Sequence, residues 1–418
     1  MAIPSIALIP TGTKAGKLYS VLPEDGSGDF TVVRATTATR VNENGLIESV
    51  ANNVPRLDYT NGGCPVLLTE PQSTNLITYP LSFDNAYWIK SGLSVVSGQS
   101  SPSADSPTGA FKLVESSANE LHRIRTSSIT RTSGITYTIS IYVKPNGRLI
   151  FINAVAFCNA NSTFDLSNGT IADTASGTAK IELLSNGWYR CSVTGTATAT
   201  GSTVFYTQIN NTGFGDDSYQ GDGTSGVYIF GGQVEALSYP TSLMLPLTEG
   251  SITTRNADQV TDSGDVNDFN STEGVLMAEI SALYDDLTFR VISLSDGTSS
   301  NSIWLYYSAD SNVIKIYDGT NALAYSTDTT VNSKVAYVYD AVSTRLYING
   351  FNVGSIAFKS FSGFNNLTFK DEAGTNPFYG KTKQIQVFKS ALTNLEIETL
   401  TSWESFILMA SAQQYIIY

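Results

Sequence analysis

The side chains that could do chemistry in this sequence are mainly carboxylates and aromatic rings, because it contains 37 Asp and Glu but one histidine. That residue, His122, cannot build a multi-histidine metal site, and any histidine-based triad would depend on it alone. Its charged neighbours on a predicted strand are typical of a surface residue or of one whose hydrogen bonds are satisfied. No G-x-S-x-G motif occurs, and no carboxylate pair stands out as the acid and base of a glycosidase. The sequence therefore predicts a protein that is not an enzyme.

Aromatic residues are the candidates for a glycan site, since aromatic faces stack on sugar rings while Asn, Asp and Gln bind the hydroxyls. Trp304, Tyr306 and Tyr307 lie in a stretch that alternates with apolar residues, so Trp304 can face either side of a strand. Trp88 and Trp188 are further candidates, although core packing is the commoner role of a tryptophan that enters a strand.

Calcium is the ion that this composition favours, because the chain offers hard oxygen ligands. The candidate ligands lie in a Gly- and Asp-rich stretch at residues 214–223, and they are Asp216, Asp217 and Asp222. A second group at three-residue spacing consists of Asp262, Asp265 and Asp268. Neither group matches the EF-hand pattern, and Asp and Gly are also the residues that turns require. A calcium site and solvated turns are therefore both open interpretations, and no other cofactor is expected.

Charge and apolar patterning exclude several partners. The formal net charge is −13 and the pI is about 4.5, so the chain would repel the phosphates of a nucleic acid. The longest apolar run, residues 149–158, is too short to cross a bilayer, and the first ten residues lack the basic region of a signal peptide. Three widely spaced cysteines form neither a disulfide framework nor a CxxC pair, and we expect them to be buried apolar residues of a protein made in a reducing compartment.

Strand signals dominate the chain. Residues 137–144 carry apolar side chains at every second position, which predicts a strand with one buried face. Asn349-Gly350 separates two short apolar runs and predicts a hairpin, because both residues accept a positive φ. Helical periodicity is scarce, but Thr393 and Glu396 have the spacing of a capping box and are followed by Ile397 at a helical interval. The prediction is an all-β protein with two antiparallel β-sandwich (jelly-roll) domains and a short C-terminal helix.

Turn and proline signals divide the chain into four parts. These are a small N-terminal β region at 1–70, a strand-rich block at 71–248, a second block at 249–404 and a tail at 405–418. Between residues 256 and 400 there are 9 Lys and Arg against 17 Asp and Glu, so this stretch carries −8 of the total charge. We expect the second block to present a solvated acidic surface, which favours neutral sugars over acidic polysaccharides as ligands.

Several segments resemble, in their order along the chain, virion proteins of tailed bacteriophages. Residues 69–77 (TEPQSTNLI) and 83–88 (FDNAYW) are similar to the opening of a carbohydrate-binding-module-like jelly roll in those proteins. Residues 226–235 and 250–258 resemble its last strands, and residues 30–40 the N-terminal region of the same proteins. The second block is similar to a concanavalin A-like, laminin-G-type sandwich, on the segments 273–280, 345–350 and 378–396.

The resemblance implies a virion structural protein, made in the host cytoplasm, that serves as a fibre, appendage or decoration subunit. Its N-terminal region would dock to other virion proteins, and its sandwiches would face outward and bind host-surface glycan. A homotrimer is expected because that oligomer is typical of fibres, although the sequence contains no heptad or collagen-like repeat that would indicate it. The alternatives are a lectin whose main role is host adsorption, with or without calcium, and a polysaccharide depolymerase.

Overall fold

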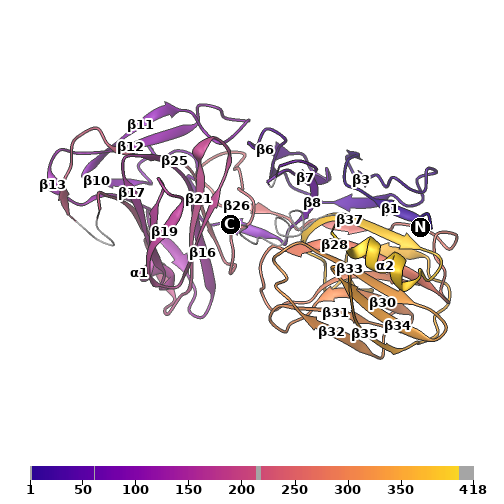
Figure 1. Cartoon of the computed structure of the whole chain (residues 1–418). Helices are drawn as coiled ribbons and strands as arrows, with labels where there is room; N and C mark the ends of the chain where they lie inside the picture. The colour runs from indigo at the N-terminus through magenta and orange to yellow at the C-terminus, as the bar shows by residue number, and fades with distance from the viewer. Residues whose placement is uncertain (1, 61, 213–217, 404–418) are drawn as a thin grey trace.

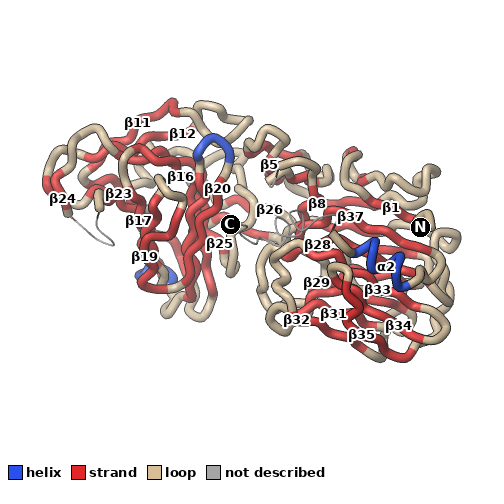
Figure 2. The backbone as a smooth tube through the Cα atoms, in the orientation of Figure 1, coloured by secondary structure: helices blue, strands red, loops and turns tan. Residues whose placement is uncertain are grey.

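The computed structural model describes residues 2–60, 62–212 and 218–403, and these fold into two lobes of antiparallel strands (Figure 1). Strands make up nearly all the regular structure (Figure 2). The described helical segments are short, and they are α1 (Val155–Cys158), a 3₁₀ turn (Ser185–Gly187) and α2 (Asn394–Thr401). The predicted all-β class with a C-terminal helix is confirmed.

The first lobe is a sandwich of two six-stranded sheets. One sheet runs in the order β10 (Ile89–Ser91), β14 (His122–Arg125), β23 (Tyr206–Asn210), β17 (Leu149–Asn153), β18 (Asn161–Asp165) and β19 (Thr170–Ser176). The other runs β11 (Leu93–Gln99), β12 (Ala110–Glu115), β25 (Gly226–Glu235), β16 (Thr136–Asn146), β21 (Tyr189–Thr196) and β20 (Thr178–Leu183). Two small ribbons, β13 (Asn119–Glu120) with β24 (Tyr219–Gln220) and β15 (Ile129–Arg131) with β22 (Gly201–Thr203), complete this lobe.

The central strand β16 is buried on both faces, whereas its alternating pattern predicts one buried face. Ile139 and Ile141 point into the core between the sheets. On the opposite face, Tyr142 packs with Leu243 and Ile47 in a second apolar cluster. The expected solvent face is therefore covered by the chain leaving β25 and by the hairpin of β5 (Ala38–Val41) and β6 (Ile47–Val50).

The second lobe packs an eight-stranded sheet on a five-stranded one. The larger sheet runs β35 (Phe351–Ala357), β34 (Ser343–Ile348), β33 (Ser333–Tyr339), β28 (Gly274–Ala282), β37 (Gly380–Phe388), β8 (Val66–Thr69) and β7 (Arg56–Asp58), with β1 (Ile6–Leu8) also paired to β37. The smaller runs β32 (Ala322–Ser326), β31 (Val313–Tyr317), β30 (Ser302–Tyr307), β29 (Arg290–Ser295) and β36 (Asn366–Thr368). A four-stranded sheet of β2 (Thr13–Lys14), β3 (Lys17–Leu18), β4 (Phe30–Val33) and β27 (Gln259–Thr261) adjoins them.

The predicted N-terminal region at 1–70 is not separate from the second sandwich in this structure. Strands β1, β7 and β8 extend its larger sheet, and Leu8, Phe30 and Leu67 belong to its single apolar core. In Figure 1 these indigo strands lie along the second lobe beside β37. Strand pairing and burial of apolar surface thus join residues that are more than 300 positions apart, and the first lobe is an insertion between two parts of one sandwich.

The chain crosses between the lobes as a two-stranded antiparallel ribbon. It leaves the second sandwich in β9 (Ser73–Asn75) and returns in β26 (Thr253–Arg255), with Asn75 paired opposite Thr253. The Asn75 amide donates to the carbonyl of Gly232 and its oxygen accepts from the backbone N–H of Val234, so the ribbon is hydrogen-bonded to β25.

A buried ion network lies at the base of this ribbon. The carboxylate of Asp258 binds the guanidinium groups of Arg34 and Arg56, with an N–O distance of 2.8 Å to Arg34. Glu70 binds Arg56 at 2.6 Å and Arg255 at 2.7 Å. Because these charges are excluded from water, each depends on its partners. The network thereby connects the N-terminal strands to both strands that lead to the first lobe.

Two local predictions are confirmed in detail. Asn349 and Gly350 connect β34 to β35 with φ values of 50° and 89°, as a two-residue turn of positive φ requires. At the start of α2, the Thr393 hydroxyl accepts from the backbone N–H of Glu396, and the Glu396 carboxylate accepts from the N–H of Thr393. Within the described ranges no helix has the length and apolarity needed to cross a bilayer.

Candidate functional site

Strand β30 places two of the predicted aromatic residues on the outer face of the five-stranded sheet. Ile303, Leu305 and Tyr307 point into the core of the second sandwich. Because side chains alternate along a strand, Trp304 and Tyr306 face the other way. Tyr307, which sequence reasoning considered with them, is therefore a core residue.

The outer face gathers four rings, which we call the aromatic platform: Phe289, Trp304, Tyr306 and Tyr317. Tyr317 on β31 is paired opposite Trp304, and the two ring centroids lie 5.2 Å apart. Trp304 and Tyr306 meet edge to face at 6.0 Å, and Phe289 stacks on Tyr306 at 5.8 Å with an interplanar angle of 21°. Each ring is thus fixed by a neighbouring ring.

A carboxylate fixes the indole of Trp304. Its Nε1–H faces both carboxylate oxygens of Glu372, at 3.2 and 3.1 Å. Burial raises the pKa of Glu372, while hydrogen bonds from Trp304, Ser302 and Ser293 favour its ionised form and oppose the rise. The indole orientation is set before any ligand arrives, which lowers the entropic cost of binding.

The rings of the platform differ in their exposure. Phe289 is 40% exposed, and Trp304 and Tyr317 are half-buried. Tyr306 is only 6% exposed, because it lies between Phe289 and Trp304. A ligand would therefore contact Trp304, Tyr317 and Phe289, and Tyr306 would support them from below.

Trp88 and Trp188 do not offer a face to a ligand. Both are 1% exposed. Trp88 stacks on Phe83 at 4.7 Å inside the first sandwich, and Trp188 packs with Tyr142 beneath the chain that leaves β25. Their candidacy as glycan-stacking residues is wrong, because both rings are used to fill apolar cores.

Sequence reasoning missed Phe289, Tyr317 and Glu372. Tyr317 ends an alternating run at 313–317, so its face could have been predicted once the pairing of β31 with β30 was known. Phe289 and Glu372 lie in loops, and no periodicity places a loop residue next to a strand.

The first lobe carries a smaller aromatic patch that was also not predicted. The Arg123 guanidinium lies 5.0 Å from the centre of the Tyr206 ring, and the Asn153 amide donates to the Tyr206 hydroxyl at 2.7 Å. Phe151 packs edge-on against the same ring. This patch is on the outer face of the sheet that contains β17 and β23, so each sandwich has one polar and aromatic outer surface.

The predicted calcium ligands are not assembled in the described part of the chain. Asp216 and Asp217 lie outside the described residues. Asp222 caps its own turn by accepting from Thr224 and Ser225, and it faces Arg148 at 3.2 Å, which would repel a cation. No group of three acidic, His or Cys side chains close enough to hold a metal occurs among the residues described, and this includes Asp262, Asp265 and Asp268.

His122 is a buried residue whose ring lies among backbone oxygens. Its Nδ1 is 2.5 Å from the carbonyl oxygen of Gly92, and its Nε2 is 3.2 Å from that of Tyr219. The ring also packs edge to face on Tyr219. Of the two predicted alternatives, a surface residue and a residue with satisfied hydrogen bonds, His122 is therefore the second. Because it is buried, a substrate could not reach it as a base.

Comparisons with known proteins concern the second sandwich most directly. None of the curated proteins compared matches the chain. Among solved structures, it is similar to the CBM40 of the Ruminococcus gnavus IT-sialidase bound to alpha2,3 sialyllactose, with 17% identity, coverage of 32% of this chain and 84% of that one, and a TM-score of 0.28.

A putative carbohydrate binding protein from Bacteroides ovatus shares 11% identity over 67% of this chain and 79% of its own, with a TM-score of 0.26. Domain 4 of the arabinanase AbnA from Geobacillus stearothermophilus, in complex with arabinotriose, shares 13% identity over 35% of this chain and 73% of its own, with a TM-score of 0.30. Scores this low assign no ligand to this chain. The informative match is that of residues 264–398 to the Concanavalin A-like lectin/glucanases superfamily, the family to which the second sandwich is similar.

Proposed function

We propose that this protein binds carbohydrate through the aromatic platform of its second sandwich. The observation that carries the proposal is the locked indole of Trp304, held by Glu372 and flanked by Tyr317, on the outer face of the five-stranded sheet. Sugar rings present apolar C–H faces to such rings and hydroxyls to the polar groups around them. The match of residues 264–398 to a lectin-containing superfamily supports the same function.

The charges around the platform favour a neutral glycan. Glu372 borders Trp304, and Asp310, at the end of β30, already pairs with Lys315 on β31. The second sandwich also carries the larger share of the chain's net negative charge. An acidic polysaccharide would therefore meet the like charge of Glu372 at the platform, where Lys315 is already paired.

The setting we propose is a virion: a non-enzymatic fibre, appendage or decoration subunit, assembled as a homo-oligomer such as a trimer, that displays its sandwiches toward the host surface. The support is the ordered resemblance of residues 30–40, 69–77 and 250–258 to phage virion proteins. These segments contain four residues of the buried network, Arg34, Glu70, Arg255 and Asp258. The part of the chain that resembles phage proteins therefore includes the joint between the lobes. A free lectin and a depolymerase are the alternatives.

Binding is tested with the full chain on a glycan array of neutral and acidic oligosaccharides, in calcium and in EDTA. We expect a neutral glycan to bind in both conditions. Trp304→Ala should weaken it about tenfold, which corresponds to about 1.4 kcal/mol of lost stacking. The matched control is Tyr325→Ala on the neighbouring strand β32, which removes a ring that is 43% exposed and lies outside the platform. Equal binding by Trp304→Ala and wild type would refute the platform as the site.

The virion setting has its own test. Mass spectrometry of purified particles should find the protein in the virion, and its presence only in lysate would refute this part of the proposal. Release of reducing ends from the bound glycan would favour the depolymerase, and an unchanged glycan is the expected result.

A further inference from the structure

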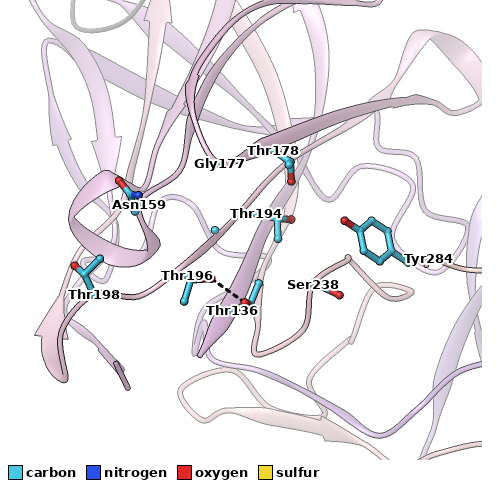
Figure 3. A pocket seen from close by; sticks show the side chains of 10 residues that line it. Thr136, Asn159, Gly177, Thr178, Thr194, Thr196, Thr198, Ser238 and Tyr284 are labelled. Atoms are coloured by element: carbon cyan, nitrogen blue, oxygen red, sulfur yellow. Dashed lines mark hydrogen bonds between the residues drawn. The ribbon is translucent and has the colours of Figure 1, made fainter. Parts of the chain in front are cut away.

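A pocket of about 470 Å³ lies where the two lobes meet (Figure 3). The first lobe supplies the ends of β16, β20 and β21, the residue after α1 and the segment that follows β25. The second lobe supplies one residue, Tyr284, from the loop between β28 and β29. The lining residues are Thr136, Asn159, Gly177, Thr178, Thr194, Gly195, Thr196, Thr198, Ser238 and Tyr284.

The lining is rich in hydroxyl groups and has no charged side chain. Thr136 and Thr196 share a hydrogen bond of 2.9 Å between their hydroxyls. The hydroxyls of Thr178, Thr198 and Ser238, by contrast, have no hydrogen-bond partner among residues 2–60, 62–212 and 218–403. Several donors and acceptors therefore line one volume and can bind a ligand that is itself rich in hydroxyls.

Tyr284 forms an aromatic wall of this pocket. One face of its ring stacks on Tyr239, with centroids 5.6 Å apart and an interplanar angle of 18°. Tyr239 is 5% exposed, whereas Tyr284 is 40% exposed, so the partner ring supports Tyr284 and leaves its other side open. Figure 3 shows the Tyr284 hydroxyl directed toward the side that carries Thr178 and Thr194.

The opposite wall is held in place by close backbone packing. A Cβ at Gly195 would lie 2.2 Å from the carbonyl oxygen of Cys158, and one at Gly177 would lie 2.4 Å from that of Thr194. Both positions therefore require glycine, and Gly177 also has a φ of 72°. The threonines of β20 and β21 sit on this tightly packed backbone, so their hydroxyls are positioned before binding.

We infer that this interlobe pocket is a second binding site for a neutral carbohydrate unit, built jointly by the two sandwiches. One rigid aromatic face, several free hydroxyls and no charge match a neutral sugar, and they disfavour phosphate, carboxylate and cationic ligands. Its volume is within the range of small-molecule pockets, which begins at about 300 Å³. The inference rests on the proposed function for its ligand class, but it uses none of the platform residues.

The test measures binding of cellohexaose, maltohexaose and mannohexaose to the full chain by calorimetry, with oligogalacturonate as the acidic probe. Tyr284→Ala and Thr178→Val should each weaken one of the two binding events of a neutral hexamer at least fivefold. Tyr284→Phe should retain most of it, because the stacking face remains. Tyr325→Ala is again the control for removing an exposed tyrosine. All changed side chains are exposed, and thermal unfolding would verify that each variant folds.

The outcomes separate this inference from the proposed function. Loss of one binding event in Tyr284→Ala with the other retained, and the reverse in Trp304→Ala, supports the interlobe site. Full binding by Tyr284→Ala, with loss in Trp304→Ala, refutes the interlobe site and leaves the platform in place. Absence of binding by the wild-type protein to all three neutral hexamers would overturn both, and preference for oligogalacturonate would overturn the assignment of a neutral ligand.

Discussion

Substituting Asp258 by Asn should strongly destabilise the second sandwich, because this carboxylate is the centre of the buried ion network. Its side chain is 3% exposed and binds Arg34 and Arg56. It also accepts the backbone N–H of Glu70 at 2.9 Å. The substitution keeps the shape but removes the carboxylate that Arg34 binds and leaves Arg56 and Arg255 to share that of Glu70.

The magnitude follows from the burial. Removing one partner of a buried ion pair costs about 3–5 kcal/mol, since the remaining charges cannot recover their hydration. The folded unit comprises the described residues 2–60, 62–75 and 253–403, a size at which 1 kcal/mol shifts the melting temperature by about 2–4 °C. We therefore expect the transition of this sandwich to fall by about 6–20 °C.

Differential scanning calorimetry of wild type and Asp258→Asn measures this shift. The matched control is Asp310→Asn, which breaks the pair with Lys315 at a side chain that is 65% exposed. Surface pairs of this kind contribute about 0–1 kcal/mol, so the control should melt within a few degrees of wild type. A shift in Asp258→Asn no larger than that of the control would refute the view that the buried network stabilises the second sandwich.

Three further results are expected. Ion pairs with Arg255 and Arg56 hold the pKa of Glu70 below its ordinary value of 4.5, against the opposing effect of burial. The ionised carboxylate therefore stabilises the folded protein above that pH, and this contribution is lost as the pH falls. Glu70→Gln should flatten the decline of the melting temperature below about pH 4.5. Burial raises the pKa of Cys158 to about 12 and that of Cys191 well above its usual range, whereas Cys64 is exposed, so a thiol reagent should label one cysteine in the native protein and three in denaturant. Deleting residues 1–70 should give insoluble protein. Replacing residues 76–252 by Asn-Gly, which joins Asn75 to the facing Thr253, should leave a soluble sandwich whose circular dichroism spectrum is that of a β-protein.

Patterns within a few residues of each other predicted their structure well. The alternation at residues 303–307 indicated a strand with Trp304 on one face, and the spacing of Thr393 and Glu396 indicated the capping box. Both depend on contacts inside one element, so the sequence specifies them directly. The choice of face for Trp304 needed the sheet, because only Ile303 and Leu305 in the core show which side is inside.

What could not be predicted depends on long-range contacts. A boundary at residue 70 follows from turn signals, but the pairing of β1 and of β8 with β37 makes this N-terminal region part of the second sandwich. Cys64 was expected to be buried and is exposed. The expected acidic surface is also reduced, since Asp318 and Asp371 are buried and accept backbone N–H groups of their own turns.

The pairing of Ile6 with Val387 and of Asn75 with Thr253 has a mechanical consequence. A tension applied between the first and last strands would enter and leave at the same end of one antiparallel pair, β1 with β37, which separates one hydrogen bond at a time. The inserted lobe is attached at two adjacent points and would carry no tension until the surrounding sandwich had opened. A load applied between the two lobes would instead pass through the β9–β26 ribbon and the ion network beneath it, so the joint between the lobes would be strained first.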